Sequence, residues 1–339
     1  MHRVGKRMKK AGGYAKYGYI FALPFTIAFL LFMLYPICYT LAIGFTDLKG
    51  LGMTQIHFLK DDPFKNFKQI LGSNVFRTAL KNTVKIWLCN FVPQIGLALL
   101  LTAWFTDRRS TIKGQGLFKV LYYMPNIITA ATIAILFRAL FGYPMGPMND
   151  LVLSVGKLFP FLHLPEKPVY FLQNKSTAQG VIIFIQTWMW YGNTMIMLIA
   201  GVLGISPEIF EASEIDGANK FQTFFYVTLP NIRTILLYVL VTSLIGGLAM
   251  FDIPQLFLAG GPDNATLTTS VFIYNQAFKG SYMYNRAAAA SMIMFAIMVA
   301  CSLVLFYIMR DKDEIRLKKE QKAWMKAEIE RRKNEGRAS

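Results

Sequence analysis

The sequence predicts an all-α integral membrane protein with six membrane-spanning helices. Hydrophobic residues make up 54% of the 339 residues, and the mean hydropathy is +0.39. This composition is too apolar for an ordinary soluble protein. The chain also contains six apolar runs of about 20 residues or more, the length a helix needs to cross the hydrocarbon core of a bilayer. We predict spans at residues 17–45, 80–105, 117–141, 180–203, 232–251 and 287–309.

The distribution of positive charge indicates the orientation of these spans. The formal net charge is +17, but the basic residues gather at the two ends of the chain and in the loop that holds Arg108, Arg109 and Lys113. Such clustering is typical of cytoplasmic loops, whereas a uniform basic stripe would indicate nucleic-acid binding. We therefore expect no nucleic-acid partner. Six spans place all three clusters in the cytoplasm, although segment 46–79 also carries lysines and must lie outside.

The basic N-terminus followed by an apolar run also resembles a secretory signal. However, the run that begins at Tyr17 is too long for a signal sequence, and no small-residue cleavage site follows it. We predict a basic cytoplasmic N-terminus at residues 1–16, a membrane domain at 17–310 and a charged cytoplasmic tail at 311–339. The tail is expected to form a solvated helix, and a contact with a partner or with anionic lipid is an alternative role.

The sequence contains no pattern typical of a metal or nucleotide site. The three cysteines, Cys38, Cys89 and Cys301, have neither metal-ligand spacing nor a disulfide framework. The phosphate-binding pattern Gly-x-x-x-x-Gly-Lys-Ser/Thr is absent from the sequence, so we expect no ATP hydrolysis by this chain.

The outer loop 142–176 holds five prolines, and we predict a short amphipathic helix at 149–161 within it.

The cytoplasmic loop 205–231 is the longest charged interruption between apolar spans in the second half of the chain. Its first part favours a helix with carboxylates at Glu211, Glu214 and Asp216. Gly217 can end that helix in a left-handed turn, and Leu229-Pro230 is expected to open the next span. A short acidic helix between two spans is typical of a docking knob and not of a catalytic pocket.

The residues of this loop resemble a known family. Glu-Ala-x-x-x-Asp-Gly-Ala at 211–218, followed by Leu229-Pro230, is similar to the cytoplasmic EAA loop of ABC importer permeases, above all the MalF-type subunit of carbohydrate importers. Ser213 stands where that family usually has a second alanine. Gly146 with Asn149, and Gly260-Gly261-Pro262 with Thr266, are similar to further elements of the family. The resemblance covers most of residues 17–310.

The resemblance implies a fold, a set of partners and a location. The fold would be the six-helix core of a type I ABC importer permease (MetI-like), in the bacterial cytoplasmic membrane with both termini cytoplasmic. The partners would be a second, MalG-type permease, a dimer of ATPase subunits and an extracellular solute-binding protein. ATP and Mg would bind on the ATPase, and this chain would hold no cofactor. The ATPase-coupling residues would be Glu211, Ala212, Ser213, Asp216, Gly217, Leu229 and Pro230.

These coupling residues would have different roles. Glu211 would pair with a basic residue of the ATPase, and Asp216 would cap and fix the loop. The small residues Ala212, Ser213 and Gly217 would allow close approach of the partner.

Polar and small residues within two spans predict a substrate path. In each span the residues recur at intervals of three, four and seven, which places them on one helical face. Amides, hydroxyls and an aromatic ring suit a sugar, and packing between helices is the alternative reading. The path residues are Gln186, Met189, Trp190, Asn193, Ser243, Gly246, Gly247 and Met250.

The predicted path contains no charged residue, which indicates a neutral solute and argues against ion-coupled transport. We therefore expect a permease subunit that moves a sugar or oligosaccharide, with another neutral solute as an alternative. A secondary transporter would show intramembrane charges or inverted repeats, and a membrane enzyme would show a clustered catalytic site. The sequence shows none of these.

Overall fold

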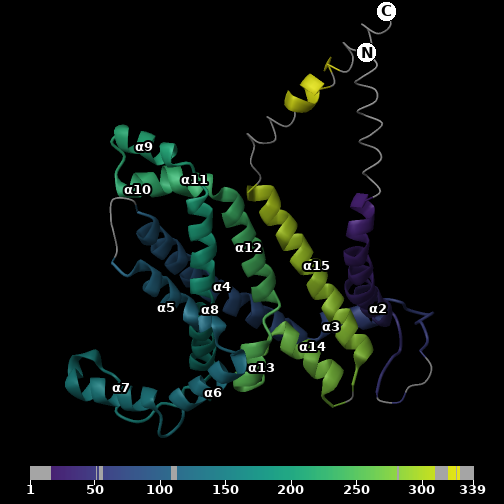
Figure 1. The fold of residues 1–339 in the computed structure, drawn as a ribbon. Coiled ribbons are helices and arrows are strands. Elements are labelled where there is room, and N and C mark those ends of the chain that lie inside the picture. The colour runs from purple at the N-terminus through teal and green to yellow at the C-terminus, as the bar shows by residue number, and fades with distance from the viewer. Residues whose placement is uncertain are drawn as a thin grey trace, which may run out of the picture.

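The computed structural model describes residues 17–50, 52, 56–107, 113–280, 282–309, 320–325 and 327–328. Within these residues the chain is almost entirely helical, and the one β-bridge pairs Thr46 with Phe58. Figure 1 shows long helices running between two ends of the molecule. The end that carries α9 is the one predicted to be cytoplasmic and is named the cytoplasmic end, and the end that carries α13 and α14 is named the outer end. The N-terminal 16 residues, most of the charged tail, and Arg108 and Arg109 of the second basic cluster lie outside the described residues.

Five described helices are long and apolar enough to cross a membrane, and one bent pair of helices makes a sixth if the pair is counted as a single span. The first is Tyr17–Ile43, which includes a π-helical turn, η1 (Leu30–Leu34), and ends in α2 (Tyr35–Ile43). The others are α4 (Asn74–Thr106), α8 (Lys175–Leu203), Arg233–Leu258 and α15 (Tyr284–Met309). The predicted all-α membrane fold is therefore confirmed.

The third predicted span is not one straight helix. Residues 117–141 form α5 (Gln115–Ile127) and α6 (Ala130–Leu140), which meet at a bend of 91°. Ile128 is extended, and the Thr129 hydroxyl accepts a hydrogen bond from Thr132 N and so starts a new helix. Asn126 Nδ2 donates to Met189 O of α8 at 3.3 Å, which fixes the bend against the bundle.

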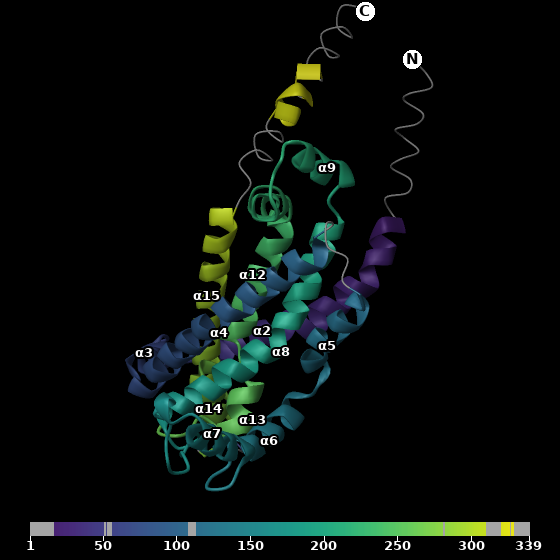
Figure 2. The same ribbon diagram turned by 90° about the vertical axis from the view of Figure 1, so that its left-hand side faces the viewer.

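The centre of the bundle is the pair α4 and α8, which pack along most of their length, with α5 across α8 (Figure 2). Gly192 of α8 permits this crossing, because a Cβ there would lie 2.0 Å from the backbone oxygen of Tyr122 in α5. Small residues at such crossings let two helix backbones approach closely in a membrane.

The cytoplasmic connection between α8 and α12 is a series of short helices. These are α9 (Pro207–Ile215), α10 (Lys220–Gln222), the π-helix η3 (Thr223–Thr228) and α11 (Leu229–Asn231), which lead into α12 (Arg233–Leu248). Leu229-Pro230 opens α11 with the proline in its first turn, just before α12, although helical backbone already begins at Lys220. The Asn219 side chain starts it by capping Gln222 N at 2.9 Å.

The outer end is held by buried polar side chains. After α13 (Asp252–Leu258), the loop to α14 (Thr269–Phe278) contains Gly260, which has a φ of +92°. Asn82 Nδ2 of α4 donates to Asn264 O at 2.7 Å, and Gln179 Nε2 of α8 donates to Ala265 O at 2.6 Å. These bonds fix the loop across the outer ends of the two central helices.

A second outer feature is the lobe formed by α7 (Pro147–Leu158) and the 3-10 helix η2 (Pro160–Leu162), which extends sideways in Figure 1. The predicted short helix is confirmed at this place. Asn149 organises the lobe, since its buried amide donates to Gly142 O and Val169 O and accepts from Val169 N. The remaining outer helix, α3 (Lys65–Gly72), packs against α15.

Candidate functional site

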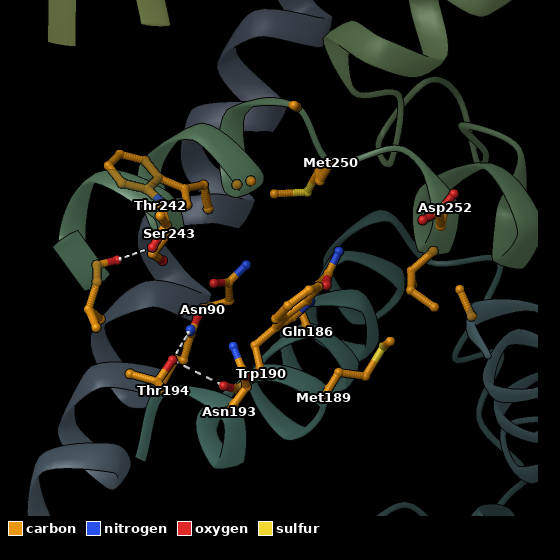
Figure 3. A pocket seen from close by; sticks show the side chains of 18 of the residues that line it. Asn90, Gln186, Met189, Trp190, Asn193, Thr194, Thr242, Ser243, Met250 and Asp252 are labelled. Carbon is orange, nitrogen blue, oxygen red and sulfur yellow. Dashed lines mark hydrogen bonds between the residues drawn. The ribbon is translucent and has the colours of Figure 1, made fainter. Parts of the chain in front are cut away.

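A cavity of about 300 Å³ lies between α4, α8 and α12, lined by residues near the middle of α4 and α8 and in the outer part of α12 (Figure 3). The structure brings all eight predicted path residues to its wall. They are Gln186, Met189, Trp190, Asn193, Ser243, Gly246, Gly247 and Met250. Two separate helical faces, inferred from spacing alone, therefore face one space.

The α8 face supplies unpaired amides and an aromatic ring. Gln186 is only 8% exposed, yet neither its amide nor that of Asn193 makes a hydrogen bond to any residue that the structure describes. Trp190 is 45% exposed and lines the same space. A buried amide without a partner costs free energy unless a guest or water satisfies it. The arrangement therefore favours a polar guest.

The α12 face divides into packing and lining positions. A Cβ on Gly247 would lie 1.8 Å from Cδ1 of Trp87, so Gly247 is required for the indole of α4 to pack there. A Cβ on Gly246 would meet nothing within 4 Å, so this glycine opens directly to the cavity. Gly247 therefore both packs against α4 and lines the cavity.

Sequence reasoning missed the wall contributed by α4. Trp87, Asn90 and Gln94 line the cavity at intervals of three and four, the same spacing that identified the faces of α8 and α12. Gln94 Nε2 donates to Thr194 Oγ1 at 2.9 Å, and Thr194 Oγ1 donates to Trp190 O at 3.1 Å (Figure 3). This chain of bonds fixes one side of the wall, and the polar residues within the second span were the signal for it.

The structure corrects the expectation that no charge lies on the path. Asp252, the first residue of α13, also lines the cavity, just beyond the predicted end of the fifth span at residue 251. Lys, Arg and His are absent from the described residues around the cavity. Nor does any group of three His, Cys, Asp or Glu in the described part of the chain lie close enough to hold a metal ion.

The predicted coupling residues lie on a cytoplasmic knob formed by α9 and the short helices after it. Phe210 anchors α9, because it is buried in a cluster with Leu101 and Phe105 of α4 and Val202 of α8. Glu211 and Ala212 are exposed, whereas Ser213 is only 7% exposed and its hydroxyl donates to Phe210 O at 2.7 Å. The expectation that Ser213 allows close approach of a partner is therefore wrong, because this residue faces the interior of the chain.

Gly217 ends α9 in a left-handed conformation, as predicted, with a φ of +76°. Ala218 N donates to Ser213 O and Gly217 N donates to Glu214 O, both at 3.0 Å, which satisfies the last carbonyls of the helix. Asp216 occupies the C-cap position through its backbone, and its side chain is exposed. Because a Cβ on Gly217 would meet nothing within 4 Å, backbone conformation and not crowding within this chain requires glycine here.

The knob presents large apolar side chains to solvent. Ile215, Phe221 and Tyr226 are 87%, 77% and 79% exposed. Pro230 is also exposed, and Leu229 lines an apolar groove of about 670 Å³ between η3 and the cytoplasmic half of α4. An ion pair between Lys220 Nζ and Asp107 Oδ2 joins α10 to the end of α4. Exposed apolar surface of this kind marks protein–protein contacts.

Comparison with known proteins identifies related chains. Residues 70–318 match the family described as "Binding-protein-dependent transport system inner membrane component". The chain is 30% identical over 297 residues to the lactose transport system permease protein LacF of Rhizobium radiobacter, an alignment that covers 87% of this chain and 94% of LacF. It is 28% identical over 289 residues to the arabinooligosaccharides transport system permease protein AraP of Bacillus subtilis, covering 85% and 87%.

Solved structures share the fold. The chain is similar to a chain in the crystal structure of a bacterial ABC transporter involved in the import of the acidic polysaccharide alginate, with a TM-score of 0.72 and 22% identity over 90% of this chain and 98% of that one. A second structure of the bacterial alginate ABC transporter, in complex with an alginate pentasaccharide-bound periplasmic protein, gives a TM-score of 0.73 and 23% identity over 90% and 97%. The predicted importer-permease fold is thus confirmed.

Proposed function

This chain belongs to the family of inner membrane components of binding-protein-dependent transport systems, and we propose that it forms half of the path by which an ABC importer moves a sugar or oligosaccharide across the bacterial cytoplasmic membrane. The relatives named above are permease subunits and not enzymes, and lactose and arabinooligosaccharides are the solutes in their names. The observation that carries the proposal is the midspan cavity with its unpaired amides.

Sugar chemistry fits the cavity wall. A sugar presents hydroxyl groups around its edge and apolar C–H groups on its faces. The Gln186 and Asn193 amides can donate to and accept from hydroxyls, and the indole of Trp190 can stack on a sugar face. Each amide–hydroxyl bond typically contributes about 1 kcal/mol, and several together give recognition without a net charge.

The knob is the proposed coupling element to a separate ATPase, which would bind ATP and Mg. Glu211 is exposed beside Ala212, and apolar Ile215 and Phe221 lie nearby on the same knob. A carboxylate flanked by apolar side chains can form an ion pair with a basic residue in an apolar groove of a partner protein. The other proposed partners are a second permease, which would complete the path, and an extracellular solute-binding protein, with both termini of this chain in the cytoplasm.

The anchoring of α9 supports a mechanical link between knob and cavity. Phe210 packs with Leu101 of α4, Val202 of α8 and Val239 of α12, and these three helices also form the cavity wall. A partner that moves α9 as a rigid body therefore moves the helices around the cavity. Closure of the ATPase dimer would then shift the equilibrium between two conformations of these helices, one open to the outside and one open to the inside.

The test is uptake by the intact transporter with the variants Gln186→Ala and Asn193→Ala. We expect each to lower uptake about fivefold to tenfold, because a lost hydrogen bond of about 1 kcal/mol is amplified when a polar group of the substrate is left unpaired. Gln173→Ala is the matched control, since Gln173 is exposed in the outer loop and does not line the cavity. Normal uptake in both variants, with Gln173→Ala also normal, would show that these amides only pack.

A further inference from the structure

The cavity carries a negative charge with no positive charge to balance it. Asp252 is the one charged side chain among the described residues that line it, and Lys, Arg and His are absent from the same described set. Asp252 forms no ion pair with any described residue, since the described pairs join Asp62, Asp107 and Asp263 to lysines. The carboxylate is exposed, and therefore open to a passing solute.

The place of Asp252 in the fold is the outer mouth of the cavity. It starts α13, which follows the outer end of α12, whereas α9 and the knob lie at the opposite end (Figure 1). In Figure 3 its carboxylate lies apart from Trp190 and Asn193. Asp252 follows the outer end of α12 and Asn193 lies in the inner half of α8, so a solute that enters from outside meets Asp252 before it reaches Asn193.

A charge in this position acts on other charges more strongly than one on an open surface. The wall of the same cavity includes apolar Met189, Met250 and Ile253, which give it a low-dielectric lining. Clefts lined by one sign of charge with low-dielectric walls focus the electric field, and rings of acidic side chains select cations in channels on this principle.

We propose that Asp252 is a charge filter that admits neutral and amino sugars and disfavours acidic sugars such as uronic-acid oligosaccharides. The proposal rests on the sugar-transport function inferred above, and names the class of sugar. Asp252 also lies in the first turn of α13, where a carboxylate stabilises a helix N-terminus. The experiment must therefore separate a filter from a structural carboxylate.

The probes are three β-1,4-linked disaccharides of similar size, built from glucose, glucosamine or glucuronate, at a pH that keeps the amines protonated. Binding to the complex that co-purifies with this chain in nanodiscs, without solute-binding protein, is measured by calorimetry. We expect the glucuronate disaccharide to bind about tenfold more weakly than the glucose disaccharide, a difference of about 1.4 kcal/mol. In Asp252→Asn the gap should shrink to about threefold or less, and the preference should weaken in about 1 M salt.

Two further variants sharpen the result. Asp252→Lys should favour the glucuronate disaccharide, which a merely structural carboxylate would not produce. Asp263→Asn is the matched control, because Asp263 is a 77% exposed outer carboxylate outside the cavity, and this variant should keep the wild-type preference. The salt series on the wild-type complex needs no substitution, so the proposal stays testable if a variant fails to assemble.

The outcomes separate this inference from the function on which it rests. If the neutral disaccharide binds and the acidic one binds equally well, or if Asp252→Asn keeps the full gap, the filter is refuted and the sugar path stands. If none of the three disaccharides binds to the wild-type complex, the cavity is not a sugar site and both proposals fall.

Discussion

Replacing Gly217 by valine tests whether the end of α9 couples the knob to its partner. The residue has a φ of +76°, and a Cβ there would meet no atom of this chain within 4 Å. The cost within the chain is therefore purely conformational, roughly 1–2 kcal/mol for an L-residue in the left-handed region, and more for a β-branched one. A cost of about 1.4 kcal/mol shifts the local equilibrium about tenfold away from the native turn.

The strain acts on the two bonds that close α9. Release of the left-handed turn breaks the bonds from Ala218 N to Ser213 O and from Gly217 N to Glu214 O, and so frays the segment next to Glu211. Uptake and binding-protein-stimulated ATP hydrolysis by the reconstituted complex should fall together, about fivefold to tenfold. Glu211→Lys should lower both by a separate route, because it reverses a charge at the proposed interface.

The controls isolate backbone strain from added bulk. Gly116→Val adds the same side chain at an exposed cytoplasmic glycine with an ordinary φ and no neighbour within 4 Å, and should leave uptake unchanged. Gly217→Asn should retain most activity, since asparagine tolerates the left-handed region better than other non-glycine residues. Normal uptake and ATP hydrolysis in Gly217→Val and Glu211→Lys, with co-purification of the ATPase intact, would refute the coupling role of this loop.

Two further predictions concern topology and packing. In a background without the exposed Cys38 and Cys89, a cysteine at Asp216 should react with an impermeant reagent only from the cytoplasm, and one at Asn264 only from outside. Labelling of position 216 in intact cells would contradict the six-span orientation. Ser213 is unsuitable for this scan because it is buried. Gly247→Ala should destabilise the protein by about 1–3 kcal/mol through its clash with Trp87, measured by thermal unfolding in detergent, whereas Gly246→Ala should not; equal stability of the two would show that the indole moves aside freely.

The positions of the spans were accessible from the sequence because apolar length alone determines them. The predicted second and fourth spans, 80–105 and 180–203, lie within α4 (Asn74–Thr106) and α8 (Lys175–Leu203). The bend in the third span was not accessible in the same way. It depends on a cap by Thr129 inside an apolar run and on a bond from Asn126 to α8, which is a tertiary contact.

Only part of the cavity wall could be predicted from the sequence. Spacing identified the faces of α8 and α12, but only the structure shows that they converge with Asn90 and Gln94 of α4. Asp252 was missed because it falls one residue beyond the predicted span. The inward orientation of Ser213 had a signal in the sequence. Ser213 lies three residues after the apolar Phe210, so the two share one face of α9, and Phe210 is buried.

The contact between Trp87 and Gly247 has a consequence for how related transporters acquire new substrates. Trp87 packs against two hydrophobic clusters, one that contains Ile182 and Phe257 and one that contains Leu248 and Val271. A substitution at Gly247 therefore alters the packing of the bundle and the cavity together. Gly246, one residue earlier, has open space in front of it. A larger side chain at Gly246 would reduce the volume available to a bound solute and leave the packing of the helices unchanged. Divergence in solute size is therefore less constrained at Gly246 than at Gly247, which makes Gly246 a suitable position to randomise when this chain is evolved toward smaller solutes.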